Sequence, residues 1–153
     1  MQLLRLEKGY YLKNRISIDI SPGAYIYAAA ALLILPIPWF VAALFAAAVH
    51  ESGHILALKL CEVKISKMTI GVGGAKILTA HLSTVEELIC ALSGPAVGML
   101  AALLFGHFPR FAFCCFVQSV FNFLPFYPFD GGRVLRCIIS FFRVDNFHQS
   151  AKL

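Results

Sequence analysis

The sequence His50-Glu51-Ser52-Gly53-His54 lies inside an apolar segment, residues 38–60, and constrains the fold more than any other feature. Because residues four apart share one face of a helix, His50 and His54 can direct two ring nitrogens at a single metal ion. Glu51, one position round the helix, can then reach a water molecule at that ion, which is the spacing found in zinc hydrolases. A charged group at the centre of a membrane helix costs about 2.5–3.5 kcal/mol, so these residues predict a functional site.

The composition predicts an integral membrane protein. Of 153 residues, 59% are hydrophobic, and the mean hydropathy is +0.79, which exceeds what a soluble core of this size requires. The net charge of +5 comes from basic residues at the ends of apolar runs, which argues for membrane orientation and against nucleic-acid binding. The first twenty residues carry several charges and no apolar core, so we expect no cleaved signal peptide. Five cysteines without a C-x-x-C pair are expected to be apolar packing residues.

Four apolar segments predict the fold class, an all-α membrane protein with about four transmembrane helices and a small membrane-associated β-hairpin or sheet. We place the spans at residues 22–36, 38–60, 85–106 and 110–124, within a single domain, residues 1–153. The alternative for the first two is one kinked span from Ala24 to Val49. We prefer two spans, because Pro36 and Pro38 interrupt a helix and the kinked span would leave His50 to His54 in water.

Two polar regions predict β-structure. In residues 1–20 the alternation of Ile16, Ile18 and Ile20 indicates a short hairpin at the membrane surface. Residues 62–80 combine alternating apolar positions with central glycines and predict a second hairpin. A phosphate-binding loop is the competing interpretation of these glycines, but no P-loop lysine follows them and no helix begins directly after them.

Ser83 with Glu86, or Thr84 with Glu87, has the spacing of a capping box, so we interpret both glutamates as helix caps. Further on, residues 122–132 contain prolines and glycines that cannot continue a helix, although flanking aromatics place this backbone at membrane depth. Such backbone is tolerated in lipid only where protein buries it or it lines a wet cavity. Asp130 lies there, either as the cap of an interfacial helix at residues 131–143 or as a third metal ligand, since two histidines leave a catalytic zinc one protein ligand short.

The basic residues predict the orientation in the membrane. Four precede the first span, four lie between Lys59 and the end of the second hairpin, four follow from Arg133 onward, and only Arg110 lies in the link between the third and fourth spans. With four spans, the three larger groups share one side, which the positive-inside rule assigns to the cytoplasm. We therefore expect both termini in the cytoplasm.

H-E-x-x-H in an apolar helix, Ser93-Gly94-Pro95 in a later helix, and N-x-x-P-x-x-P-x-D-G-G from Asn122 to Gly132 together resemble the site-2 protease family of zinc intramembrane metalloproteases. The most similar subgroup is the sporulation protease that processes a membrane-tethered sigma-factor precursor, a protein of the bacterial cell membrane. Compared with that subgroup, the sequence ends before two further spans and a cytoplasmic regulatory domain, and it has no PDZ domain.

The resemblance implies one zinc ion bound by His50, His54 and Asp130, with Glu51 activating the water. It implies that the segment containing Asn122, Pro125 and Pro128 borders the active site, and that the sheet in residues 62–80 holds an extended substrate. An amide such as Asn122 is a candidate for stabilising the oxyanion.

The predicted function is a zinc-dependent intramembrane endopeptidase that cleaves transmembrane or membrane-tethered proteins, with regulated proteolysis of a signalling or sporulation factor as one role. A substrate helix must unwind before cleavage, and a strand edge can pair with the exposed backbone. The candidate strand residues are Val72, Gly73, Gly74 and Ala75; the alternative is that these glycines only form a turn. We expect a single-span membrane protein as substrate, while a regulatory membrane partner and oligomerisation stay open. A noncatalytic zinc-binding or assembly protein is the alternative function.

Overall fold

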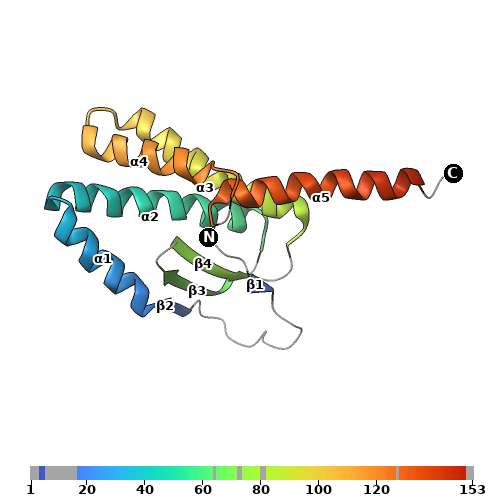
Figure 1. The fold of residues 1–153 in the computed structure, drawn as a ribbon, viewed down its shortest axis with the longest axis horizontal. Helices are drawn as coiled ribbons and strands as arrows, with labels where there is room; N and C mark the ends of the chain where they lie inside the picture. The colour runs from blue at the N-terminus through green and yellow to red at the C-terminus, as the bar shows by residue number, and fades with distance from the viewer. Residues whose placement is uncertain are drawn as a thin grey trace.

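The computed structural model describes residues 4–5, 17–63, 65–71, 74–79, 82–126 and 128–150. Within them, helices and strands follow one another from the N-terminal strands to the long last helix (Figure 1). The helices are α1 (Pro22–Ile34), α2 (Ile37–Leu60), α3 (Thr84–Leu104), α4 (Pro109–Asn122) and α5 (Asp130–Ser150), and the strands are β1 (Leu4–Arg5), β2 (Ser17–Ile20), β3 (Ile65–Gly71) and β4 (Gly74–Thr79).

Helices α2, α3 and α4 form the body of the molecule, with α1 diverging from α2 and α5 running away from the bundle (Figure 1). Small side chains fill the interior, where Ala46, Ala101 and Cys115 form a buried cluster between the three helices. Large apolar side chains point outward instead: Phe45 is 62% exposed and Leu103 is 75% exposed. Small residues inside and large apolar residues outside are the arrangement expected of helices that pack in lipid.

Two helices, α2 with 24 residues and α3 with 21, are long and apolar enough to cross a membrane. Helix α1 is apolar but has 13 residues, and α4 has 14, whereas a crossing needs about 20 residues. The structure therefore gives two full-length candidate spans where the sequence predicted four. The break between α1 and α2 at Leu35 and Pro36 separates the first two predicted spans, and α2 continues through both histidines to Leu60.

Helix α2 ends in a tight turn that directs the chain into the sheet. The amide of Val63 donates to the carbonyl of Leu58 at 2.9 Å, and the amide of Glu62 donates to the carbonyl of Lys59 at 3.0 Å. Glu62 adopts the left-handed conformation, with φ of 56°, at the position where helices commonly end on glycine. This turn brings β3 back beneath the second half of α2, where Leu58, Ile77 and Cys90 form a second buried cluster.

The sheet has four strands in the order β1-β4-β3-β2. Strands β3 and β4 form the antiparallel hairpin expected in residues 62–80, with Ile70 opposite Ala75 and Gly71 opposite Gly74. The described parts of residues 1–20, β1 and β2, do not pair with each other as the predicted hairpin would require: they lie on opposite edges of the sheet, where β1 pairs in parallel with β4 and β2 with β3. A parallel partner distant in sequence leaves no turn signal by which it could be recognised.

The ends of α3 and α5 test the predictions made for two helix boundaries. The Ser83–Glu86 capping box is present, with the Ser83 hydroxyl accepting from the Glu86 amide, so this half of the capping prediction is confirmed. Glu87 does not cap the helix but lies near Arg133. Helix α5 begins at Asp130 and continues to Ser150, well beyond the predicted end at residue 143.

Candidate metal centre

The two histidines and Asp130 meet at one buried point. His50 and His54 lie one turn apart on α2, and their Nε2 atoms are 3.1 Å from each other. The Oδ2 atom of Asp130, at the first turn of α5, is 3.1 Å from the Nε2 atom of each histidine. The side chains are at most 4% exposed. Helices that begin 93 residues apart in the chain, at Ile37 and Asp130, thus supply three donor atoms to one small volume.

The irregular segment between α4 and α5 carries Asp130 to this point. Short-range hydrogen bonds fold it back, with the amide of Phe129 donating to the carbonyl of Phe126 at 3.0 Å. Gly131 then packs directly on the end of α4: a Cβ atom on Gly131 would lie 2.2 Å from the carbonyl oxygen of Phe123. Since no side chain fits there, glycine after Asp130 allows α5 to begin beside the histidines.

A backbone carbonyl on α3 sets the orientation of His54. The Nδ1 atom of His54 is 2.7 Å from the carbonyl oxygen of Cys90, which also accepts from the hydroxyl of Ser93 at 2.7 Å. A carbonyl can only accept, so Nδ1 carries the proton and, in the neutral ring, Nε2 carries a lone pair. That lone pair points toward His50 Nε2 and Asp130 Oδ2, and a carboxylate also only accepts. The lone pair of His54 Nε2 and the carboxylate oxygen of Asp130 thus meet at one buried point beside His50 Nε2, and a cation bound there would satisfy them.

The distances between the three atoms fit a tetrahedral ion. An ion with bonds of about 2.0–2.1 Å, as zinc makes to histidine nitrogen and carboxylate oxygen, holds its ligand atoms about 3.3 Å apart. The observed separations of 3.1 Å are close to that value. The carbonyl of Cys90 behind His54 is also a typical partner for the second nitrogen of a metal-binding histidine. His50, His54 and Asp130 therefore could hold one metal ion.

Glycines on facing helices let α3 approach this centre closely. A Cβ atom on Gly94 would lie 2.3 Å from Nε2 of His54, and one on Gly53 would lie 2.7 Å from the carbonyl oxygen of Ser93. Thus Gly53 lets the two backbones meet, and Gly94 leaves room for the imidazole. The predicted Ser93-Gly94-Pro95 element is in this way part of the wall of the site, with Gly94 and Pro95 buried.

The other predicted site residues lie at varying positions relative to this centre. Glu51 follows His50 on α2 and is half-buried. Asn122 ends α4, where its amide nitrogen donates to the carbonyl of Gln118 at 2.9 Å, so this amide contacts its own helix. Pro125 and Pro128 are exposed in the segment that leads to Asp130. Of the strand candidates, Gly74 and Ala75 begin β4, while Val72 and Gly73 lie outside the described residues.

Sequence reasoning missed one charged pair beside the centre. Arg133 is 5% exposed, and its Nη1 atom donates to Oδ1 of Asp130 at 3.2 Å. Its Nε atom is 3.7 Å from Oε1 of Glu87 on α3. The spacing could have indicated the contact between Arg133 and Asp130, because residues three apart share one face of a helix. Glu87, however, was interpreted only as a helix cap.

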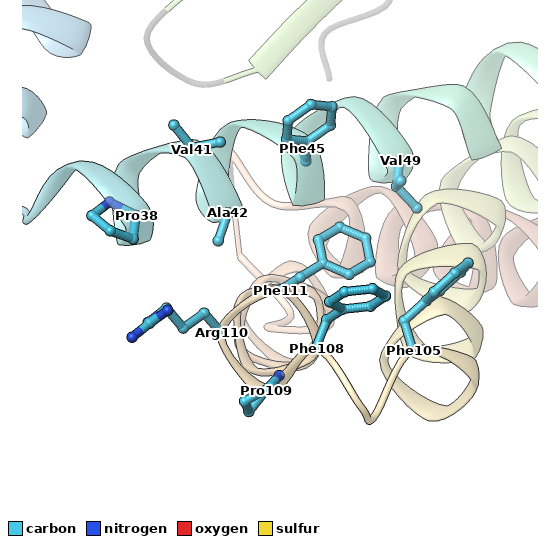
Figure 2. Close-up of a pocket in the computed structure, with 10 residues that line it drawn as sticks. All are labelled: Pro38, Val41, Ala42, Phe45, Val49, Phe105, Phe108, Pro109, Arg110 and Phe111. Atoms are coloured by element: carbon cyan, nitrogen blue, oxygen red, sulfur yellow. The ribbon is translucent and has the colours of Figure 1, made fainter.

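An apolar groove of about 640 Å³ lies between the first half of α2 and the start of α4 (Figure 2). Val41, Phe45 and Phe111 line it, and Arg110 is the charged residue among its lining. None of the three converging ligands lines this groove. The chemistry therefore belongs to the buried centre and not to this open apolar surface.

Comparisons with known proteins point to the same chemistry. No protein-family model matches the chain. A zinc metalloprotease of Methanocaldococcus jannaschii is 25% identical over 115 residues, which are 66% of this chain and 34% of that protein. The solved structure of a site-2 protease from the same organism matches with a TM-score of 0.68 at 22% identity, over 80% of this chain and 67% of that one.

The chain has the site-2 protease fold. The resemblance to this family drawn from the motifs is thereby confirmed, whereas the sporulation subgroup stays a prediction. The chain spans about a third of the length of the curated relative that it matches.

Proposed function

We propose that this protein is a zinc-dependent intramembrane endopeptidase that cleaves transmembrane or membrane-tethered proteins. The observation that supports it most directly is the convergence of His50 Nε2, His54 Nε2 and Asp130 Oδ2 at mutual distances of 3.1 Å inside a helix bundle with an apolar exterior. The name of the curated relative, a zinc metalloprotease, supports zinc as the ion and peptide hydrolysis as the reaction.

The role of each residue in the proposed reaction follows from the position of its side chain. When bound, zinc supplies Lewis-acid chemistry, polarising a peptide carbonyl and making water acidic enough to react near neutral pH. His50, His54 and Asp130 would hold the ion as its three protein ligands. Glu51, adjacent to His50 on α2, accepts the proton of the attacking water and returns it to the leaving amine. The carbonyl of Cys90 keeps His54 in the tautomer that binds metal.

The membrane topology that accompanies this function has four crossings and both termini in the cytoplasm. The short helix α1 makes the first of these crossings, and α2 and α3, which are long enough to cross a membrane, make the second and third. Helix α4 and the irregular segment after it make the fourth, since non-helical backbone at membrane depth is tolerated where protein buries it. The single-span substrate enters beside α1, which has no buried residue along its length. A regulatory membrane partner is part of this proposal.

The outer edge of β4 is the proposed place for the unwound substrate. On one side, Gly74 and Ala75 pair with Gly71 and Ile70 of β3. On the other side, β1 pairs with β4 only at Leu78 and Thr79, as far as the described residues extend. The edge of β3 is covered by β2 from Lys67 to Ile70. An extended substrate can therefore add its backbone to the first half of β4.

The experiment that tests the function is co-expression with a panel of single-span transmembrane proteins, in which the intact chain is compared with Glu51→Gln. Cleavage within the transmembrane segment by the intact chain, and its loss in Glu51→Gln, is the expected result. A chain that binds zinc but cleaves no member of the panel, with the intact protein folded in detergent, would favour the noncatalytic zinc-binding alternative.

A further inference from the structure

The guanidinium of Arg133 is a buried charge beside the metal centre that the proposed reaction does not use. Arg133 is 5% exposed, and burying an unpaired charge in a protein costs several kcal/mol. Within the described residues, its recorded partners are the carboxylates of Asp130 and Glu87. Such a residue is kept in an apolar bundle only if its charge has a role or a strong partner.

The two oxygens of Asp130 have different partners. Oδ2 lies 3.1 Å from both histidine nitrogens, whereas Oδ1 accepts from Nη1 of Arg133 at 3.2 Å. The terminal torsion of an aspartate is broad and roughly two-fold, so the carboxylate has no strong preference of its own for this orientation. The contact with Arg133 removes that freedom, because rotating the carboxylate would break the hydrogen bond to Oδ1.

Arg133 is in turn held from the opposite helix. Its Nε atom is 3.7 Å from Oε1 of Glu87, one turn into α3, whose side chain is 27% exposed. This distance exceeds that of a hydrogen bond, so Glu87 acts on Arg133 chiefly through charge. The Glu87–Arg133 pair therefore connects α3, which carries Cys90 and Gly94, with the start of α5, which carries Asp130.

We propose that Arg133, held by Glu87, is the positioning residue that fixes the Asp130 carboxylate with Oδ2 directed at the two histidines. The inference rests on the metal centre of the proposed function. Arg133 then affects metal affinity through Asp130, without contacting the ion itself. Outer partners of this kind typically change metal affinity by about 10–100-fold when they are removed.

The test compares Arg133→Gln with Arg136→Gln in the full chain in detergent. Arg136 lies on the same helix and is exposed, so its substitution removes the same charge away from the centre. Zinc affinity is measured by competition with a chromogenic chelator, and the ligand geometry is read from the visible spectrum of the cobalt-loaded protein. We expect Arg133→Gln to lower affinity about 10–100-fold and to change the cobalt spectrum, with Arg136→Gln resembling the intact chain.

A double-mutant cycle separates positioning from general stability. Glu87→Gln should weaken zinc binding in the intact background and have no further effect in Arg133→Gln, because Glu87 acts through Arg133. Arg133→Lys, which keeps the charge, should have a zinc affinity between those of Arg133→Gln and the intact chain. If Arg133→Gln fails to fold, Arg133→Lys takes its place as the test variant. Wild-type affinity and an unchanged spectrum in Arg133→Gln would overturn the inference while leaving the proposed function intact. If the intact chain bound neither zinc nor cobalt, the inference and the proposed function would both be wrong.

Discussion

Gly94 lies against the imidazole of His54, so closely that a Cβ atom there would come within 2.3 Å of the ring nitrogen that faces the metal centre. The glycine on α3 and the histidine on α2 thus share one volume, which cannot hold both an imidazole and a further methyl group. The position of one proposed zinc ligand is therefore decided by the absence of a side chain on a neighbouring helix.

The first prediction follows from this contact. Gly94→Ala should displace His54 and lower zinc affinity about 10–100-fold, together with a loss of about 1–3 kcal/mol of folding stability from overpacking. Gly106→Ala is the matched control, since the nearest atom to a Cβ there is 3.9 Å away. Chelator competition and thermal unfolding in detergent measure the two effects. Equal zinc affinity in both variants would show that His54 can move without cost to the site.

The second prediction separates the roles of the four chemical residues by metal content. His54→Ala and Asp130→Ala each remove a ligand atom and should lose most of the zinc after dialysis, whereas Glu51→Gln should retain about one zinc per chain. Elemental analysis of the purified proteins measures this. Equal loss of zinc in all three variants would make Glu51 a ligand or a structural residue and not the base.

The third prediction concerns topology. In a background without native cysteines, a single cysteine replacing His107 should react with an impermeant thiol reagent added outside intact cells, while one replacing Lys67 should not. The reason is that the three larger groups of basic residues must share the cytoplasmic side. Both positions should label after the cells are opened, which controls for access. Labelling of the Lys67 position from outside would contradict the four-span arrangement.

The fourth prediction tests the edge of β4. Ala75→Pro removes a backbone donor and places a ring in the strand, so it should suppress cleavage of a transmembrane substrate while zinc stays bound. Ala75→Thr, which leaves the backbone unchanged and suits a strand, should have a mild effect. Cleavage assays and zinc analysis are carried out on both the Ala75→Pro and the Ala75→Thr proteins. Full activity in a folded Ala75→Pro protein would make the sheet structural.

Local patterns predicted the parts of this molecule that depend on neighbours in sequence. His50 and His54 were found by helical spacing, and the β3–β4 hairpin by its central glycines, because both signals lie within a few residues. For Asp130 the sequence left two roles open, a helix cap or a third metal ligand, and the metal role was suggested by an aspartate in apolar, irregular backbone. The structure places it beside the histidines, 80 positions from His50.

The parts that sequence missed depend on pairing over long distances. Strands β1 and β2 lie on opposite edges of the sheet, each parallel to its neighbour. Parallel pairing requires no tight turn, so the local sequence carries no signal for it. Glu87 had two roles open to it, a cap for its own helix or a partner for Arg133, and only the packing of α3 against α5 decides between them. Local propensity for a cap was the wrong guide here, because a buried arginine must be neutralised.

The distance along the chain between the ligands has a consequence for biosynthesis. When α2 has been made and inserted, the nascent protein contains two of the three ligands, and Asp130 is still 76 residues away from His54. The centre is complete only after α3 and α4 have docked and the irregular segment has folded back on Gly131. The growing chain therefore lacks an assembled metal centre until its last helix is made, and an ion bound at that stage would hold α2 and α5 together.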